Sequence, residues 1–256
     1  MSTPTDADAP VAISSTSQSP PLRVTKIGSD QIRIEPIEQR NLSARTYVAL
    51  KDALIAGNFR PGQRLLMQDL AEQLGTSVTP VREACMRLVS ERGLEVRSGR
   101  FVTVPDLTMA RYIEIRTIRI ELEGLAAEFA TKNITRAELA AITDLQARFE
   151  AADHAHASAE SIKLNRDFHF MVYRLARMEM LTAHIESLWI SMGPILNVYY
   201  NEVVNDYVGA EEHTHLIKAL RAKDGKKARA AITMDILRGG EALLGYLKNK
   251  AAAGAS

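Results

Sequence analysis

The sequence lacks the features of a secreted or membrane-embedded protein. Its single cysteine, Cys85, excludes an internal disulfide and fits a reducing compartment. No apolar run approaches the ~20 residues that cross a bilayer. The N-terminus also lacks the basic and then apolar pattern of a signal peptide. From these absences we expect a cytoplasmic protein with no membrane partner.

Aromatic residues and net charge are also low. Aromatics make up 5% of the 256 residues, whereas Ala, Leu, Glu, Arg and Met are plentiful. Alanine and straight-chain residues lose little rotamer freedom in a helix, so the composition predicts a mainly α protein. A net charge of +1 means that any nucleic-acid surface must be local. The length favours two domains.

Residues 1–40 are rich in Ser, Thr, Pro, Asp and Ala and show no sustained apolar period. Such a segment cannot bury enough apolar surface to offset its ordering entropy, so we expect a flexible tail. Helical order is expected to begin near Asn41, with Ser43 as a candidate N-cap.

Residues 41–105 predict a winged helix-turn-helix. Apolar residues recur at helical spacing in three short stretches, which end near Gly57, Gly75 and Gly93. Thr79 is the expected N-cap of the third helix, with Pro80 at its first position. Alternation around a Ser-Gly turn then predicts one β-hairpin over 94–104.

Residues 107–250 are expected to form an antiparallel all-helical bundle. A capping box at Thr135 and Glu138 opens one helix, and Asp224 is a plausible N-cap for the last. The predicted helices number six, at about 107–131, 136–152, 158–176, 180–205, 209–222 and 225–248.

In a helix-turn-helix the second helix of the pair enters the major groove. Arg82 stands off the apolar stripe of that helix and can donate two hydrogen bonds to guanine. Residues 41–105 contain nine basic and six acidic residues. This modest excess fits a DNA-binding surface, but it equally fits arginines that only keep the surface of a small domain soluble. The candidate DNA contacts are Ser77, Val78, Thr79, Arg82 and Met86 on the helix, and Arg97, Gly99 and Arg100 on the wing.

Two runs, GNFRPGQRL over 57–65 and LAEQLGTSVTPVREA over 70–84, closely resemble the DNA-binding signature of GntR-family regulators. Val78 stands where the family usually carries an arginine, and Gln68 where some members place a phosphate-contacting one. The resemblance implies a homodimer that reads a palindromic operator in double-stranded DNA.

The second half resembles the FCD ligand-binding domain of the FadR-like branch of that family. Arg119, Glu123 and Ala130 resemble its opening helix, and Phe168-His169 resembles its most recognisable dipeptide. Six helices would fit the VanR-like subgroup.

Four residues are candidate metal ligands. Asn165 and His169 share one helix face, and His213 and Asp235 lie on two later helices. Imidazole and carboxylate donors suit zinc, nickel, manganese or iron. The family's corresponding site typically has an Asp and three His, so here Asn165 replaces the Asp and Asp235 the last His. A buried hydrogen-bonded network without metal is the alternative.

A metal in such a cavity leaves positions that a small carboxylate effector could occupy. Arg119 is a candidate second clamp for that carboxylate, because guanidinium binds carboxylates in a bidentate way. The alternative for Arg119 is an intrahelical pair with Glu123. Trp189 and Met192 are candidate lining residues.

The sequence as a whole predicts a DNA-binding transcription regulator, repressor or activator, whose small organic acid effector binds near a metal. It does not predict an enzyme. A metal-dependent enzyme built on the helical domain is one alternative, although no H-E-x-x-H pattern supplies a general base. An architectural DNA-binding dimer without an effector is the other.

Overall fold

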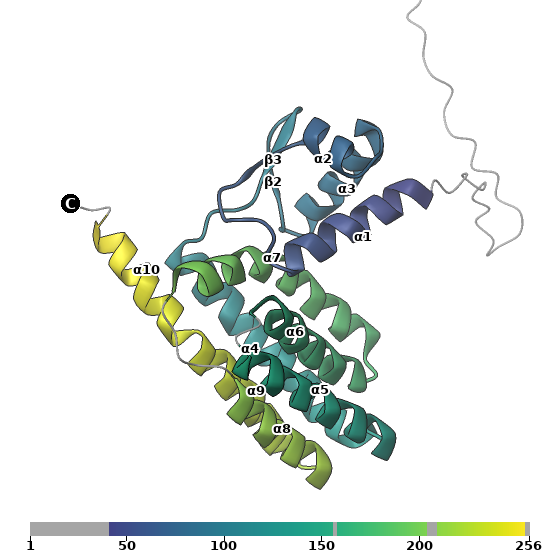
Figure 1. Ribbon diagram of the computed structural model, residues 1–256, viewed down its shortest axis with the longest axis vertical. Helices are drawn as coiled ribbons and strands as arrows, with labels where there is room; N and C mark the ends of the chain where they lie inside the picture. The colour runs from purple at the N-terminus through teal and green to yellow at the C-terminus, as the bar shows by residue number, and fades with distance from the viewer. Residues whose placement is uncertain (1–40, 156–157, 204–208, 254–256) are drawn as a thin grey trace, which may run out of the picture. The chain divides into compact units, whose positions relative to one another are not determined.

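The computed structural model describes residues 41–155, 158–203 and 209–253 (Figure 1). The tail expected over 1–40 lies outside them. The described residues are mostly helical, with one small sheet, so the prediction of a mainly α fold is confirmed. None of the described helices is long and apolar enough to span a membrane.

The first part of the described chain contains three helices and a three-stranded antiparallel sheet of order β1-β3-β2. The helix α3 packs on α1 and α2 through an apolar face that includes Val81, Cys85 and Leu88. The elements are α1 (Asn41–Ile55), β1 (Arg64–Leu66), α2 (Met67–Gln73), α3 (Val78–Ser90), β2 (Glu95–Ser98) and β3 (Phe101–Thr103).

The start of α1 and of α3 differs from prediction. Asn41 is already helical, so Ser43 lies inside α1, where its hydroxyl donates to Glu83 of α3. Ser77, and not Thr79, is the N-cap residue of α3. Pro80 therefore takes the third helical position, which it tolerates because the first N–H groups of a helix have no intrahelical partner.

The strand β1 was not predicted, because three residues are too short to show a period. Its middle residue, Leu65, is buried, and β1 pairs with the free edge of β3. At the end of α3 the left-handed residue is Arg92 (φ 61°), directly before the Gly93 near which this helix was predicted to end. Gly93 is needed for another reason, since a Cβ there would lie 2.3 Å from Cγ2 of Ile190.

Cys85 lies fully buried in α3. Burial raises the pKa of its thiol to about 11, which leaves ~100-fold less thiolate than an ordinary cysteine has at the same pH. We expect iodoacetamide at pH 8 to leave the folded protein unmodified over an hour and to alkylate it fully in urea, as mass spectrometry can check. Rapid alkylation without denaturant would contradict this burial.

The remaining described residues form helices only. The capping box at Thr135 and Glu138 and the N-cap at Asp224 are both present, as predicted. The helices are α4 (Met109–Asn133), α5 (Arg136–His154), α6 (Ser158–Leu175), α7 (Glu179–Glu202), α8 (Ala210–Ala222), α9 (Gly225–Gly239) and α10 (Glu241–Ala253).

The helix predicted over 225–248 is two helices, so the described part of this half has seven rather than six. The helix is interrupted at Gly240, where a Cβ would lie 2.1 Å from the hydroxyl oxygen of Tyr112. A tyrosine of α4 therefore occupies the space that a side chain at the α9–α10 junction would need.

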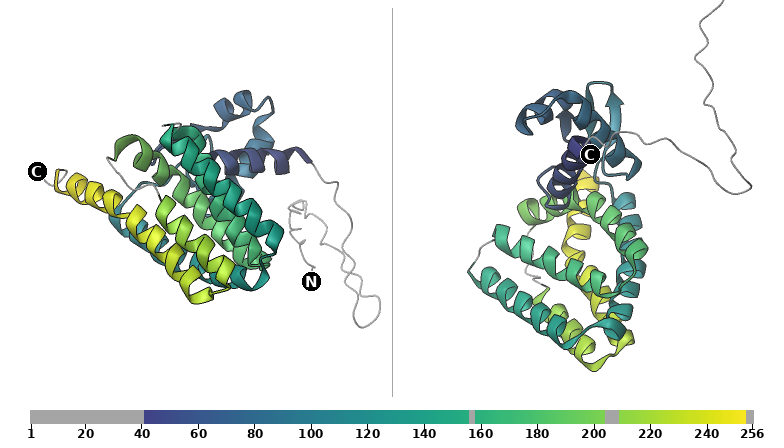
Figure 2. Two further views of the ribbon diagram at one scale, coloured as in Figure 1. Left: turned by 60° about the horizontal axis from the view of Figure 1, so that its bottom comes forward. Right: turned by 90° about the vertical axis from the view of Figure 1, so that its right-hand side faces the viewer.

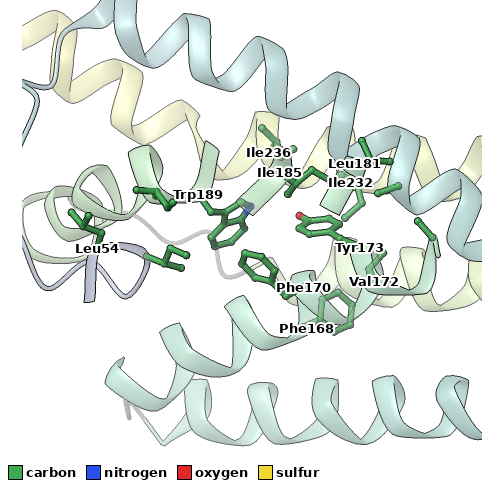
Figure 3. Close-up of a cluster of buried hydrophobic side chains, with 14 of the residues drawn as sticks. Leu54, Phe168, Phe170, Val172, Tyr173, Leu181, Ile185, Trp189, Ile232 and Ile236 are labelled. Atoms are coloured by element: carbon green, nitrogen blue, oxygen red, sulfur yellow. The ribbon is translucent and has the colours of Figure 1, made fainter. Parts of the chain in front are cut away.

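The bundle is built around α4, which contacts α6, α7 and α9, while α5 packs on α6 and α8 (Figures 1 and 2). In Figure 3 the indole of Trp189 lies between Leu54 and Tyr173, and its ring centroid is 5.2 Å from that of Phe170. A second apolar cluster joins α4, α7 and α10 and includes Tyr112, Met192 and Leu243.

Candidate functional site

The helix α3 presents most of the predicted base-reading residues to solvent. Its apolar face is fixed in the core, which leaves Arg82 on the opposite, exposed face. Val78 differs from the others because it is half-buried and packs against the core. The exposed predicted residues are Ser77, Thr79, Arg82 and Met86.

The end of β2 and the turn that follows it carry the other predicted DNA contacts. Arg97, Gly99 and Arg100 are all exposed. Arg97 forms an ion pair with Glu95, with 3.0 Å between nitrogen and oxygen. Both groups are exposed, so the pair is weak and a phosphate could compete for the guanidinium.

Three of the four candidate metal ligands meet in the bundle, each from a different helix: His169 of α6, His213 of α8 and Asp235 of α9. The two histidine Nε2 atoms are 3.3 Å apart, and Nε2 of His169 is 3.3 Å from Oδ2 of Asp235. The three potential ligand atoms all lie within 4.8 Å of one another. Asn165 stands one turn before His169 on α6, and it lines one cavity together with His169 and Asp235.

Gln146 of α5 fixes the orientation of His213. The amide nitrogen of Gln146 donates to Glu150 at 2.9 Å and to the carbonyl of Ala210 at 3.3 Å. Its amide oxygen therefore faces Nδ1 of His213, at 2.7 Å. An amide oxygen only accepts, so Nδ1 carries the proton and Nε2 presents a lone pair.

A second chain of hydrogen bonds fixes His169. The hydroxyl of Tyr173 donates to the carboxylate of Glu123 at 2.5 Å, which leaves its oxygen to accept from Nδ1 of His169 at 3.1 Å. Glu123 is fully buried and also accepts from Nε1 of Trp189 at 3.0 Å and from Arg119. Nε2 of His169 is thus also left with a lone pair.

The centre therefore brings together the Nε2 lone pairs of His169 and His213 and the carboxylate of Asp235. Burial lowers the pKa of His213 to about 3. Burial, with the nearby His213 and Arg119, holds the pKa of His169 well below its ordinary value, so both rings stay neutral. Two lone pairs and a carboxylate that face one another repel unless a cation lies between them, so these residues fit a divalent metal.

A cavity of about 270 Å³ adjoins this centre. Arg119, the candidate clamp, and Trp189 and Met192, the candidate lining residues, all border it. Arg119 forms the intrahelical pair with Glu123, donating from Nε at 2.6 Å and from Nη2 at 3.2 Å, and it also borders the cavity. Its guanidinium carbon also lies 4.9 Å from the ring of Trp189.

Sequence reasoning missed the residues that orient the histidines. Tyr173 follows His169 by four residues on α6, and that spacing could have indicated contact between them. Gln146 gave no signal, because it lies 67 residues from His213 along the chain.

Two family models match the chain. The model described as bacterial regulatory proteins of the gntR family matches residues 42–104, and that of the FCD domain matches residues 114–238.

Curated relatives and a solved structure agree with these matches. The HTH-type transcriptional regulator McbR of Escherichia coli K12 is 40% identical over 70% of this chain and 82% of its own. The uncharacterized HTH-type regulator YdhC of Bacillus subtilis is 30% identical over 72% and 82%. A solved structure of E. coli McbR/YncC has a TM-score of 0.74 at 35% identity, over 79% of this chain and 96% of that one.

The helix-turn-helix part with its β-hairpin, the helical bundle and these similarities all indicate the same family. The chain belongs to the GntR family of bacterial transcription regulators, in the FadR-like branch that carries an FCD domain.

Proposed function

We propose that this DNA-binding regulator is gated by a small organic acid, which binds beside a divalent metal held by His169, His213 and Asp235, with Asn165 as a fourth donor. The observation that carries the proposal is the meeting of two Nε2 lone pairs and a carboxylate, while each Nδ1 is occupied elsewhere. The ligand types suit zinc, nickel, manganese or iron.

The residues around the cavity support a carboxylate as the ligand. A divalent metal, when bound, supplies a positive charge that attracts carboxylate oxygens. Arg119 has five N–H groups, and Glu123 accepts from two of its nitrogens, so others can donate to a ligand. Together these groups could bind one carboxylate from two sides.

The helix α7 supports a route from the cavity to the DNA-binding part. Trp189 and Met192 border the cavity, while Asn197 donates to the carbonyl of Gly57, after α1, at 2.6 Å. A Cβ at Gly193 would lie 1.7 Å from the carbonyl oxygen of Leu54, so α7 and α1 pack backbone against backbone. An effector shifts DNA affinity only if it binds the DNA-competent and incompetent states unequally.

We also propose a homodimer that reads a palindrome in double-stranded DNA, because operator symmetry mirrors protein symmetry in helix-turn-helix dimers. Ile113 and Ile118 of α4 are 49% and 40% exposed, and a second copy could cover them. A relative 30% identical over 69% of this chain, from Paenarthrobacter nicotinovorans, is named a probable transcriptional repressor, which favours repression here too.

Selection on random duplex DNA tests the whole proposal. The full chain should enrich one palindromic sequence, and the enrichment should change when organic acids or a chelator are added. Binding without sequence preference would favour the architectural alternative. Enrichment that neither acids nor chelation alter would contradict the gating.

Replacing Tyr173 with phenylalanine should weaken zinc binding by about 10- to 100-fold, because His169 loses the partner that holds its Nδ1 proton. Competition with a chromophoric chelator measures this affinity. Tyr246→Phe is the matched control, since the hydroxyl of Tyr246 donates to the exposed Glu202 and not to a candidate metal ligand or its partner. Equal affinities for the two variants would show that Tyr173 does not orient a metal ligand.

A further inference from the structure

One face of α7 lines the cavity from beside the metal centre to the end of the helix. The lining residues are Trp189, Met192, Leu196 and Tyr199 of α7, and Val203 directly after it. They recur every three or four residues, so they lie on one side of the helix and span roughly 21 Å. Trp189 is at the metal end, because its ring centroid is 5.8 Å from that of His169. Beyond Trp189 this wall is apolar apart from the hydroxyl of Tyr199.

Tyr112, Gly240 and Leu243 also line the cavity. Tyr112 and Leu243 belong to the apolar cluster that joins α4, α7 and α10. Their contact depends on the glycine at the α9–α10 junction, where only a hydrogen fits beside the tyrosine hydroxyl. All three residues lie outside the 114–238 range that matches the FCD model, so this wall is built by residues beyond that match.

Charge in the cavity is unevenly placed. Arg119, His169 and Asp235 are at the metal end. Asp153 also borders the cavity, one turn beyond Phe149 on α5, whose ring centroid lies 5.3 Å from that of His213. A second carboxylate directed along α7 would meet apolar side chains, and one directed toward α5 would meet the negative charge of Asp153. Both disfavour a diacid.

We infer that the effector is a monocarboxylic acid with an apolar body, such as a medium-length alkyl chain or one aromatic ring. Its carboxylate faces the metal centre and Arg119, and its body lies against α7, Tyr112 and Leu243. The volume is sufficient, since an engineered cavity of about 150 Å³ holds benzene and this one measures about 270 Å³. The inference rests on the proposed acid-gated function and specifies its ligand.

Titration calorimetry on the full-length, zinc-loaded protein tests the inference with acetate, hexanoate, octanoate and octanedioate. Each added methylene should tighten binding by roughly two- to fourfold, so the six methylenes between acetate and octanoate should together give about 100-fold or more. Octanedioate should bind at least tenfold weaker than octanoate. Equal affinities across the monoacids, or tighter binding of the diacid, would overturn the inference.

Leu196→Gln tests the apolar wall, with Leu196→Met as its matched control. Leu196 is half-buried, so the folded state should tolerate both changes, and thermal unfolding checks this. The glutamine should weaken octanoate binding at least tenfold and leave acetate unchanged, whereas methionine should change neither. Equal weakening of both acids, or of neither, contradicts the assigned wall.

Zinc stoichiometry, measured separately on the same samples, distinguishes failure of the proposed function from failure of the inference about the effector. A protein that binds no zinc contradicts the proposed function. One equivalent of zinc with no dependence on chain length leaves that function standing and overturns this inference alone.

Discussion

Arg82→Ala should weaken binding to the preferred operator by about 1–3 kcal/mol, or roughly 5- to 150-fold. Arg82 is exposed on α3, one turn into the helix, while Val81 and Cys85 hold that helix in the core. Half-buried Val78 cannot supply a charged donor, so we expect Arg82 to contribute more of the base contacts. Fluorescence anisotropy with the selected operator and a scrambled duplex measures the effect.

The control is another arginine of the same helix. Arg87 lies 3.6 Å from the ring of Tyr47 and pairs with Glu91 at 3.2 Å, so its guanidinium is already engaged. Arg87→Ala should change operator affinity little. If Arg82→Ala weakens operator and scrambled DNA equally, Arg82 contacts phosphate and does not read a base.

Glu123→Ala should lower the free energy of unfolding by about 3–5 kcal/mol, because it leaves the buried guanidinium of Arg119 without its counter-charge. Glu123 is fully buried, Arg119 is 8% exposed, and Tyr173 and Trp189 donate to the same carboxylate. Urea unfolding measures the loss, and Trp189 is the chain's one tryptophan, so its fluorescence reports on this site directly.

Two variants make this prediction specific. Glu128→Ala removes another α4 carboxylate, whose pair with Arg229 is one-third exposed, and should lose under about 1 kcal/mol. Adding Arg119→Met to Glu123→Ala should restore part of the lost stability, since the unpaired charge is gone. A loss at Glu123 no larger than at Glu128 would mean that the buried pair is not the source of stability.

The sequence predicts most of the fold because its signals are local. Helical spacing, glycines at helix ends and a capping box depend on residues within one or two turns of each other. The errors are local too. Proline is tolerated anywhere in the first turn, so Pro80 did not reveal that α3 starts at Val78. The strand β1 forms only because β3 offers it an edge.

The sequence also indicated side chains that gather at the candidate site, but not how the fold holds them. Arg119 and Glu123 are four residues apart, and the structure places their pair inside the protein and against Trp189. A helix spacing cannot distinguish a buried pair from an exposed one, and burial decides whether the pair is worth several kcal/mol or almost nothing.

By itself the sequence determined the helical class, the winged reading head with Arg82 exposed on it, and a histidine-rich centre in the bundle. The tertiary structure alone decided that Gln146 and Tyr173 turn the lone pairs of His213 and His169 toward Asp235, and that Leu243 of α10 lines the cavity. The physical reason is range. Helix and turn preferences act over a few residues, whereas hydrogen bonds and burial join side chains that the fold brings together from distant parts of the chain.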